Sequence, residues 1–304
     1  MKIIFMGTPN FAVPILEALA KKHEVLMVVT QPDKRVGRKQ ILEESPVKIL
    51  AKTLNIPIFQ PTKLKEEYQT LLDLSADLIV TAAYGQMLPK PLLDRITALN
   101  VHGSLLPKYR GGAPIQYALF DAQKETGITI MYMAYKMDSG DIIKQGKVEI
   151  TEADNYETLT KKLSLCGKDL LLEVLDEFKQ GKPKGTPQNE NEVTFAYNIK
   201  REEEFLNFNV DTKYVLGKIR GLSPNVGASI NFKDLTIKVY DAKKSDIIKT
   251  NQPGKVHLSK TEMHIETLDG SIKILELQLP GKKKMDVRSF LNGQTVFANG
   301  DVVK

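Results

Sequence analysis

The sequence has no tryptophan and only one cysteine among its 304 residues. A single cysteine, Cys166, cannot form an intramolecular disulfide, and it cannot supply a thiolate cluster for a metal. No apolar run approaches the ~18 residues that a membrane-spanning helix needs. The first apolar run ends at Gly7, too early for the hydrophobic core of a signal peptide. These absences predict a soluble protein, and we expect it to be cytoplasmic.

The composition is that of a globular protein, with 42% hydrophobic and 26% charged residues. It does not fit a disordered, collagen-like or coiled-coil chain. The net charge of +6 is unevenly placed, because residues 1–205 carry 27 Lys and Arg against 27 Asp and Glu, whereas residues 206–304 carry 16 against 10. The basic last third indicates either a solvated lysine-rich surface or a module that binds a polyanion such as nucleic acid.

Short apolar strands alternate with amphipathic helices in the first 150 residues. Strand patterns lie at 3–6, 25–30, 57–60, 78–83, 99–101 and 129–133, and helical patterns lie at 11–19, 47–54, 65–74 and 115–122. This alternation predicts an α/β fold with a mostly parallel sheet covered on both faces. Such sheets bind their ligands at the carboxyl ends of the strands.

The pattern of alternating strands and helices ends after a long helical pattern at 156–180. Residues 181–191 are rich in turn formers, which is typical of a linker. A short helix at 212–220 then precedes β-patterned runs at 228–232, 235–240, 255–258, 263–267, 272–279 and 296–298. Short, closely spaced strands predict a small barrel. We therefore expect a catalytic domain at 1–180, a linker at 181–205 and a basic β domain at 206–304.

Four side chains could contribute to acid–base chemistry. Asn100 and His102 stand two residues apart at the end of an apolar strand, so they project from the same face. Asp138 and Asp141 lie further on, in a tight turn. An amide, an imidazole and a carboxylate can combine general acid–base catalysis with stabilisation of an oxyanion. From residue types alone, purely structural roles stay open for all of them.

The glycine after the first strand does not belong to a nucleotide-binding motif. Residues 7–10 read Gly-Thr-Pro-Asn, and the chain has neither a G-x-G-x-x-G fingerprint nor a P-loop. Nicotinamide and ATP chemistry are therefore disfavoured.

Several motifs together resemble the folate-dependent formyltransferases, along the whole chain. They are FMGTPNFA at 5–12, TQPD at 30–33, SPVK at 45–48, AYG at 83–85, the segment 100–114 and MDSGD at 137–141. The pattern N-x-H…S-L-L-P with a later D-x-G is shared by these enzymes generally. The G-T-P-x-F start, the TQPD loop and the basic β domain are similar to the branch that formylates methionyl-tRNA.

The resemblance implies a Rossmann-like formyltransferase domain followed by an OB-like barrel. It implies formyl transfer from the cosubstrate 10-formyltetrahydrofolate to the α-amino group of methionine on initiator tRNA, for translation initiation. The family's catalytic residues fall on Asn100, His102 and Asp138. Asn100 and His102 would donate to the formyl oxygen during attack by the amine, and Asp138 would orient His102. The family's folate contacts fall on Ser104, Leu105, Leu106, Pro107, Tyr84 and Gly85.

Two basic segments are expected to contact the tRNA. One is the loop 33–40, and the other is a lysine run in the β domain. Their cations are Lys34, Arg35, Arg38 and Lys39, and Lys282, Lys283 and Lys284. Such clusters bind phosphates without reading sequence, and the resemblance places Arg38 at the acceptor stem. We expect no metal and no membrane partner, and we expect a monomer.

Two alternatives stay open at this point. The first is a folate-dependent formyltransferase that acts on a small amine such as a nucleotide amino sugar, because such enzymes can carry a similar second domain. The second is a protein without enzymatic activity that binds RNA through its basic barrel. A complete set of Asn100, His102 and Asp138 disfavours the second alternative, since an inactive scaffold has no need of all three.

Overall fold

The computed structural model describes residues 1–36, 40–245, 250–293 and 296–304. Its contacts divide the chain into two compact units. The first comprises Met1–Pro114, Glu125–Glu149 and Thr160–Tyr197, and the second comprises Ile115–Lys124, Ile150–Leu159 and Asn198–Lys304. Because two internal segments belong to the second unit, the chain passes between the units more than once.

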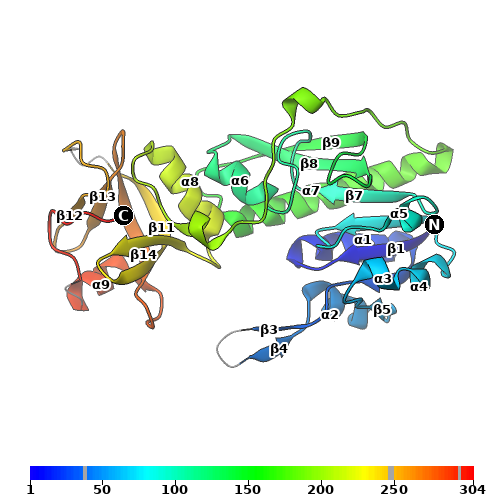
Figure 1. Ribbon diagram of the computed structural model, residues 1–304, viewed down its shortest axis with the longest axis horizontal. Coiled ribbons are helices and arrows are strands. Elements are labelled where there is room, and N and C mark those ends of the chain that lie inside the picture. The colour runs from blue at the N-terminus through cyan, green and yellow to red at the C-terminus, as the bar shows by residue number, and fades with distance from the viewer. Residues whose placement is uncertain (37–39, 246–249, 294–295) are drawn as a thin grey trace. The chain divides into compact units, whose positions relative to one another are not determined.

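The first unit is built on a seven-stranded sheet (Figure 1). Its order is β5-β2-β1-β6-β7-β8-β9, with bounds Ile58–Phe59, Glu24–Val29, Lys2–Gly7, Leu78–Ala82, Ala98–His102, Glu125–Tyr132 and Ile142–Glu149. The first five of these pair in parallel, and β8 and β9 pair antiparallel. The expected mostly parallel sheet is confirmed. The sequence did not reveal β9, because its residues are all half-buried or exposed and form no apolar run.

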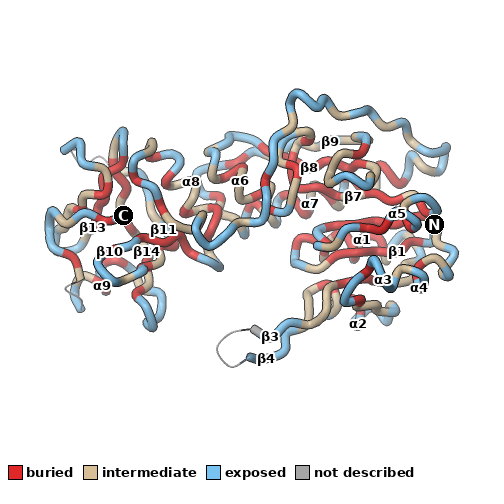
Figure 2. Tube along the Cα trace, viewed as in Figure 1, coloured by how far each residue is buried: buried red, intermediate tan, exposed pale blue. Residues whose placement is uncertain are grey.

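Helices cover the sheet of the first unit. They are α1 (Val13–Lys22), α2 (Pro46–Thr53), α3 (Leu64–Glu67), α4 (Gln69–Leu72), α5 (Lys90–Leu93) and most of α7 (Tyr156–Glu177), with a short 3-10 turn at Asn10–Ala12. Gly167 lets α7 approach β7 closely, since a Cβ there would lie 2.8 Å from a methyl group of Val101. The strands β1, β6 and β7 are buried along most of their length (Figure 2). The single helix expected at 65–74 is instead two short helices, interrupted at Tyr68.

The strand order reverses direction at β1 and β6. From β1 the chain adds β2 on one side, and later adds β6 on the other side. In open α/β sheets the crevice outside the carboxyl ends of such strands is the usual ligand site. Thr8 follows β1 and Tyr84 follows β6, and the Thr8 hydroxyl donates to the Tyr84 carbonyl at 3.1 Å. The fold therefore brings the loops after β1 and β6 together at this edge.

The second unit contains an antiparallel sheet that confirms the β character expected for the last third of the chain. Its order is β10-β11-β14-β13-β12, with β15 paired to β14, and the bounds are Ala228–Phe232, Leu235–Ser245, Ser271–Gln278, Met263–Glu266, Val256–Leu258 and Met285–Asp286. The helices are α6 (Pro114–Phe120), α8 (Thr212–Leu222) and α9 (Val287–Gly293). The strand expected at 296–298 does not form, and Phe297 packs instead on Phe232 and Phe290 in the core.

A buried carboxylate organises one end of this sheet. Glu266 is fully buried at the end of β13. It accepts hydrogen bonds from the amide of Thr250 at 2.8 Å and from the hydroxyl of Thr250 at 2.6 Å, and it lies 2.6 Å from His257 Nε2. Burial alone would raise the pKa of Glu266, but hydrogen bonds from Thr250, His257 and Gln252 outweigh it and lower the pKa to about 2. The charged carboxylate thus anchors the segment that leads into β12.

We expect Glu266→Gln to loosen this segment, because hydrogen bonds to a charged group are worth about 1.5–3 kcal/mol. A carboxyl whose pKa is lowered on folding stabilises the fold fully above its ordinary pKa and loses that contribution as the pH falls toward its folded value. Amide exchange should therefore show lower protection factors for Thr250 and Gln252 in the variant at pH 7. The difference should narrow as the pH falls toward 2. Equal protection at pH 7 would contradict this role.

Candidate active site

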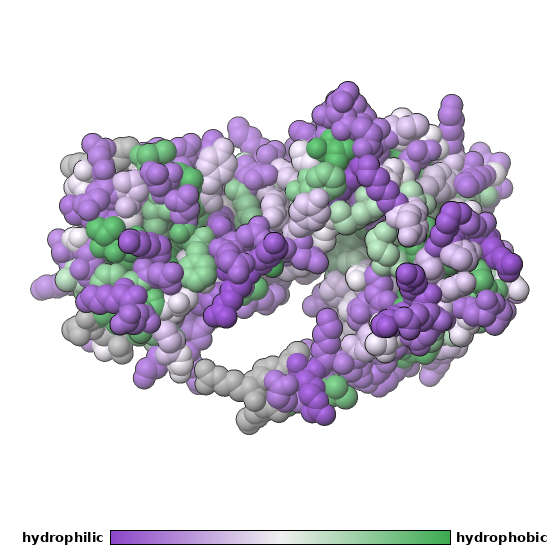
Figure 3. All heavy atoms as spheres, in the orientation of Figure 1, coloured by the Kyte–Doolittle hydropathy of each residue, from purple (hydrophilic) through white to green (hydrophobic). Residues whose placement is uncertain are grey.

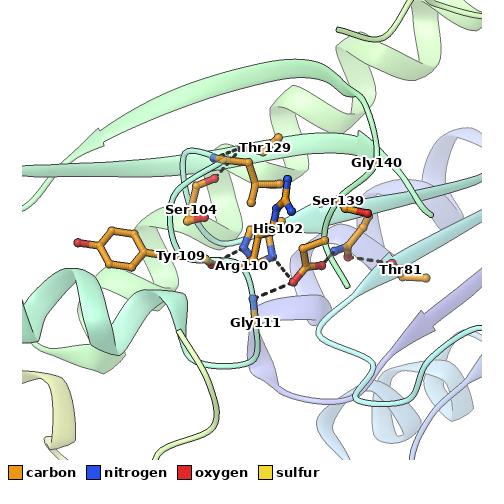
Figure 4. A network of polar contacts seen from close by, with 12 residues as sticks. Thr81, His102, Ser104, Tyr109, Arg110, Gly111, Thr129, Ser139 and Gly140 are labelled. Atoms are coloured by element: carbon orange, nitrogen blue, oxygen red, sulfur yellow. Dashed lines mark hydrogen bonds and ion pairs between the residues drawn. The ribbon is translucent and has the colours of Figure 1, made fainter. Parts of the chain in front are cut away.

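The three side chains that the resemblance selects as catalytic come together, because Asn100 and His102 both lie beside Asp138. Asn100 and His102 are in β7, and Asp138 lies in the turn between β8 and β9. One carboxylate oxygen of Asp138 accepts a hydrogen bond from the amide of Gly111 at 2.9 Å and lies 3.7 Å from His102 Nδ1. The other lies 3.4 Å from Asn100 Nδ2. Figure 4 shows His102 and Gly111 approaching this carboxylate from separate segments.

Thr81, in β6, orients the amide of Asn100. The Thr81 hydroxyl donates to Asn100 Oδ1 at 2.8 Å. With its oxygen turned toward Thr81, the amide presents Nδ2 on the side of Asp138. An amide nitrogen has two N–H groups, so Nδ2 can donate both to Asp138 and to an oxygen on a substrate. This is the kind of fixed donor that stabilises a developing oxyanion.

His102 is held at both ring nitrogens. It is buried, with 5% of its surface exposed. Its Nε2 lies 2.9 Å from the carbonyl oxygen of Tyr109, and a carbonyl can only accept, so Nε2 carries a proton. Its Nδ1 faces Asp138. The turn of Tyr109 to Gly111 therefore contacts both members of the pair, His102 through a carbonyl and Asp138 through an amide.

A segment that we name the strap, residues 183–197, runs against this turn within the first unit. The amide of Arg110 donates to the carbonyl of Thr194 at 2.9 Å, and the amide of Ala196 donates back to the carbonyl of Arg110 at 2.8 Å. A Cβ on Gly111 would lie 2.5 Å from the Ala196 carbonyl oxygen, and Gly111 has φ +128. Only glycine can let the strap approach the turn this closely.

The strap also reaches Asp138 through side chains. The guanidinium of Arg110 is fully buried and donates to Gln188 Oε1 at 2.8 and 3.0 Å, and it pairs with Glu190 at 2.8 Å. The amide nitrogen of Gln188 donates to the carbonyls of Asp138 and Gly140, both at 2.8 Å. Arg110 and Gln188 thus tie the turn that carries Asp138 to the turn that supports His102.

Sequence reasoning did not select four of these residues as functional: Thr81, Arg110, Gly111 and Gln188. Arg110 and Gly111 lie inside the segment 100–114, which the sequence marked as a motif, but nothing in the sequence indicated their roles. Thr81 looks like an ordinary residue of a buried strand. Gln188 lies in a turn-rich stretch without any pattern, and only the tertiary structure brings it to Asp138.

The residues expected to contact folate lie on the loops after β6 and β7. Ser104 and Leu106 are buried, and the Ser104 hydroxyl donates to the carbonyl of Lys108 at 2.6 Å, which closes the loop. Leu105 and Pro107 are half-buried. In the space-filling view, a shaded hollow with pale-green and white atoms lies in the part of the first unit that holds the end of β7 (Figure 3).

The other two expected folate contacts follow β6. The Tyr84 side chain is buried in an apolar cluster, and its hydroxyl has no hydrogen-bond partner within the described part of the chain. Burial and then Glu67 raise its pKa. Its carbonyl accepts from Thr8 and Gln31. Gly85 is exposed with φ +92.

The first basic segment stands on a two-stranded ribbon, β3 (Lys34–Val36) and β4 (Ile41–Glu43). Asp33 fixes its base, since it pairs with Lys48 at 2.6 Å and accepts from Gln60 at 2.8 Å. The hydrogen bond from Lys48, and then that from Gln60, lower the pKa of Asp33. Lys34 and Arg35 are exposed. The other two expected cations, Arg38 and Lys39, lie outside the described residues.

The lysine run of the second unit lies between β14 and β15. Lys282, Lys283 and Lys284 are exposed. The ammonium of Lys284 donates to the Pro224 carbonyl at 2.6 Å and lies 3.6 Å from the centre of the Tyr240 ring. Within the described ranges, no group of three or more His, Cys, Asp or Glu could hold a metal ion, and no helix is long and apolar enough to cross a membrane.

Fold and site together define an α/β enzyme with a second, antiparallel β domain. Residues 1–175 match the formyl transferase family, and residues 198–295 match the C-terminal domain of formyl transferases. The chain belongs to the formyl transferase family.

Individual relatives agree with this assignment. The chain is 49% identical to a methionyl-tRNA formyltransferase from Listeria welshimeri over 96% of its own length and 95% of the relative. The fold resembles an N-formyltransferase from Helicobacter canadensis, solved with folinic acid and dTDP-3-aminofucose, with a TM-score of 0.67, 18% identity and 94% and 100% coverage of the two chains. It also resembles HypX from Aquifex aeolicus, solved with tetrahydrofolic acid, with a TM-score of 0.66 and 19% identity. That match covers 96% of this chain but spans only 47% of HypX.

We expect Gln188→Leu to slow formyl transfer without unfolding the chain. The variant removes the donor to the Asp138 and Gly140 carbonyls. It also removes the acceptor of two hydrogen bonds from Arg110, so the turn is less firmly held from both sides. Because misplacing a catalytic group by about 1 Å can cost about 10²-fold, kcat should fall by about 10- to 100-fold. Steady-state kinetics measure the change, and thermal unfolding controls for the fold.

Glu190→Gln is the matched control for this variant. It keeps an acceptor for Arg110 and touches neither carbonyl, so its kcat should fall far less than that of Gln188→Leu. Equal losses in the two variants would show that the strap acts only through Arg110 and not through the turn of Asp138.

Proposed function

We propose that the chain transfers a formyl group from 10-formyltetrahydrofolate to the α-amino group of methionine on initiator methionyl-tRNA. The observation that carries the proposal is the 49% identity, over 96% of the chain, to a protein named for this reaction. The contact among Asn100, His102 and Asp138 supports it. The reaction serves translation initiation, so we place the enzyme in the cytoplasm, acting as a monomer.

The work is divided between the two parts of the chain in this proposal. The reacting side chains lie within residues 1–180, residues 206–304 hold the tRNA, and residues 181–205, which include the strap, connect the two. The excess of six positive charges in residues 206–304 favours a polyanionic partner there. The exposed Lys34 and Arg35 on the ribbon of the first unit offer a second phosphate contact.

The loops after β6 and β7 fit a folate. Leu105 and Pro107 are half-buried, so they keep apolar surface for a flat ring. Gly85 adopts φ +92 and has no Cβ, so its backbone is open to a ligand. Tyr84, Gly85 and residues 104–107 would hold the donor, which supplies the formyl group.

Asn100 and His102 would stabilise charge on the reacting carbonyl. When an amine attacks the formyl carbon, the formyl oxygen gains negative charge, and fixed N–H donors lower the barrier. Thr81 and Asp138 fix the Asn100 amide, so its second N–H group is oriented before the substrate arrives. Asp138 orients His102 at Nδ1. To donate to the same oxygen, the Nε2–H group of His102 would exchange the Tyr109 carbonyl for the substrate.

The attacking amine needs no strong general base. An α-amino group titrates near ~8, so a usable neutral fraction exists at pH 7. The proton released on bond formation must still reach the departing folate nitrogen. Asp138 and His102 form the acid–base pair that would carry it.

The sugar-specific alternative finds no comparable support. The likeness to the N-formyltransferase solved with dTDP-3-aminofucose is at 18% identity, and it concerns the fold alone. The relative at 49% identity is named for methionyl-tRNA. We therefore keep a single proposed substrate.

We expect Asn100→Ala, His102→Ala and Asp138→Ala each to lower the rate of formyl transfer strongly. Removing one donor to an oxyanion typically costs about 10²–10³-fold. Single-turnover transfer to methionyl-tRNA measures the chemical step apart from product release. Near-wild-type rates in folded variants would exclude the assigned roles.

We expect the double variant Lys282→Ala/Lys283→Ala to weaken tRNA binding and its salt dependence. Each lysine that neutralises a phosphate contributes roughly one unit to the slope of log affinity against log salt, so the slope should fall by up to about two units. Lys284 is kept because it packs on Tyr240. Filter binding across a salt series measures the slope.

The matched control removes two cations from the first unit, in Lys63→Ala/Lys90→Ala. The side chains of these lysines are 67% and 69% exposed, and they pair with the nearby Glu66 and Asp94. Their loss should leave the slope unchanged, and neither double variant should alter the affinity for folate. Equal slopes for both variants would count against a phosphate site between β14 and β15.

A further inference from the structure

Two aromatic rings stand exposed on the strap. Phe195 has 43% of its surface exposed and Tyr197 has 57%. Their rings are parallel within 3°, with centroids 5.3 Å apart. We call Phe195 and Tyr197 the aromatic pair. Burying large aromatic rings is energetically favourable, so a fixed, exposed pair offers an apolar surface that a partner can cover.

The backbone of the strap fixes the direction of both rings. Ala196, between them, is fully buried, and its amide and carbonyl both bond to the segment 110–113. Its amide donates to the Arg110 carbonyl at 2.8 Å, and its carbonyl accepts from the Ala113 amide at 3.0 Å. Successive side chains in extended backbone point to opposite sides. With Ala196 turned inward, the aromatic pair must face outward.

The aromatic pair stands beside the site that we propose for catalysis. A Cβ on Gly111 would lie 3.4 Å from the backbone nitrogen of Tyr197, and the amide of Gly111 donates to Asp138 at 2.9 Å. One residue, Gly111, therefore separates the backbone of the pair from the carboxylate at the centre of the site. A substrate whose reacting group reaches Asn100 and His102 brings its adjoining atoms close to the pair.

We propose that the aromatic pair stacks the unpaired bases at the 3′ end of the aminoacylated tRNA. This inference rests on the proposed function. The methionyl ester sits on the terminal nucleotide, so the bases next to it are the atoms that accompany the amine into the site. Unpaired bases stack on exposed aromatic rings with about 1–3 kcal/mol per base, independently of base identity.

The pair suits a base better than a phosphate. Phe195 offers only a π-face, and Tyr197 adds one hydroxyl, so neither brings a positive charge to the surface. Three charged side chains of the strap and the neighbouring turns are already engaged, since Arg110 and Lys136 both pair with Glu190. Phosphate contacts fall instead to the lysines and arginines described above, and the pair would hold the end of the strand by stacking.

The experiment uses the full chain and initiator methionyl-tRNA that carries 2-aminopurine in place of the terminal adenine. Stacking on an aromatic ring quenches this base, so binding to the wild type should lower its fluorescence. Phe195→Leu and Tyr197→Leu keep apolar bulk but lose the flat ring. Each should lose most of the quenching and raise the KM for methionyl-tRNA about 5- to 100-fold, the equivalent of one stacked base. The KM for 10-formyltetrahydrofolate should not change.

Tyr197→Phe is the matched control, because it keeps the ring and removes only the hydroxyl. It should retain both the quenching and the KM of the wild type. Methionine methyl ester, which has an amine but no base, should be formylated at the same rate by the wild type and the leucine variants.

The outcomes separate this inference from the proposed function. If the wild type formylates methionyl-tRNA while both leucine variants keep its quenching and KM, the aromatic pair does not stack the bases, and the proposed function stands. A rise in the KM for folate alone would assign the pair to the donor and overturn the inference. If the wild type formylates the methyl ester but not methionyl-tRNA, the proposed function fails, and the inference fails with it.

Discussion

The site depends on the carboxylate of Asp138. It lies between a backbone amide, an imidazole and a side-chain amide, from Gly111, His102 and Asn100. Each of these groups belongs to a different stretch of chain or a different part of one strand. A carboxylate with several donors around it fixes all of them at once, because moving any donor leaves a charged acceptor less satisfied. The mutual orientation of Asn100 and His102 follows from this one group.

The strap and the glycines near Asp138 hold that carboxylate in place. Asp138 has φ +46, a left-handed conformation that costs free energy and needs support. Gln188 supplies it by donating to the carbonyls of Asp138 and Gly140. Only glycine fits at position 140, because a Cβ there would collide with the Tyr132 carbonyl. The D-x-G motif is therefore a backbone requirement as much as a chemical one.

In the part of the chain that the structure describes, each unit contains a fully buried charged side chain with dense hydrogen bonding. In the first unit it is Arg110, which connects the strap to the site. In the second it is Glu266, which anchors the segment before β12. A buried charge is costly when it loses a partner, so both groups make their surroundings specific as well as stable. A buried, hydrogen-bonded charge thus fixes the local structure in both units.

The sequence by itself determined the α/β pattern of the first unit, the β character of the second and the pair Asn100 and His102, because periodicity and spacing within one strand are local properties. It pointed to Asp138 through the D-x-G motif, and to the formyltransferases through motifs spread along the chain. It gave no sign of β9, whose residues form no apolar run, or of the strap. Only the tertiary structure decided that Gln188 meets Asp138, 50 residues away in the sequence. The reason is that a single hydrogen bond between distant segments leaves no periodic trace, whereas a strand or a helix repeats its pattern over several residues.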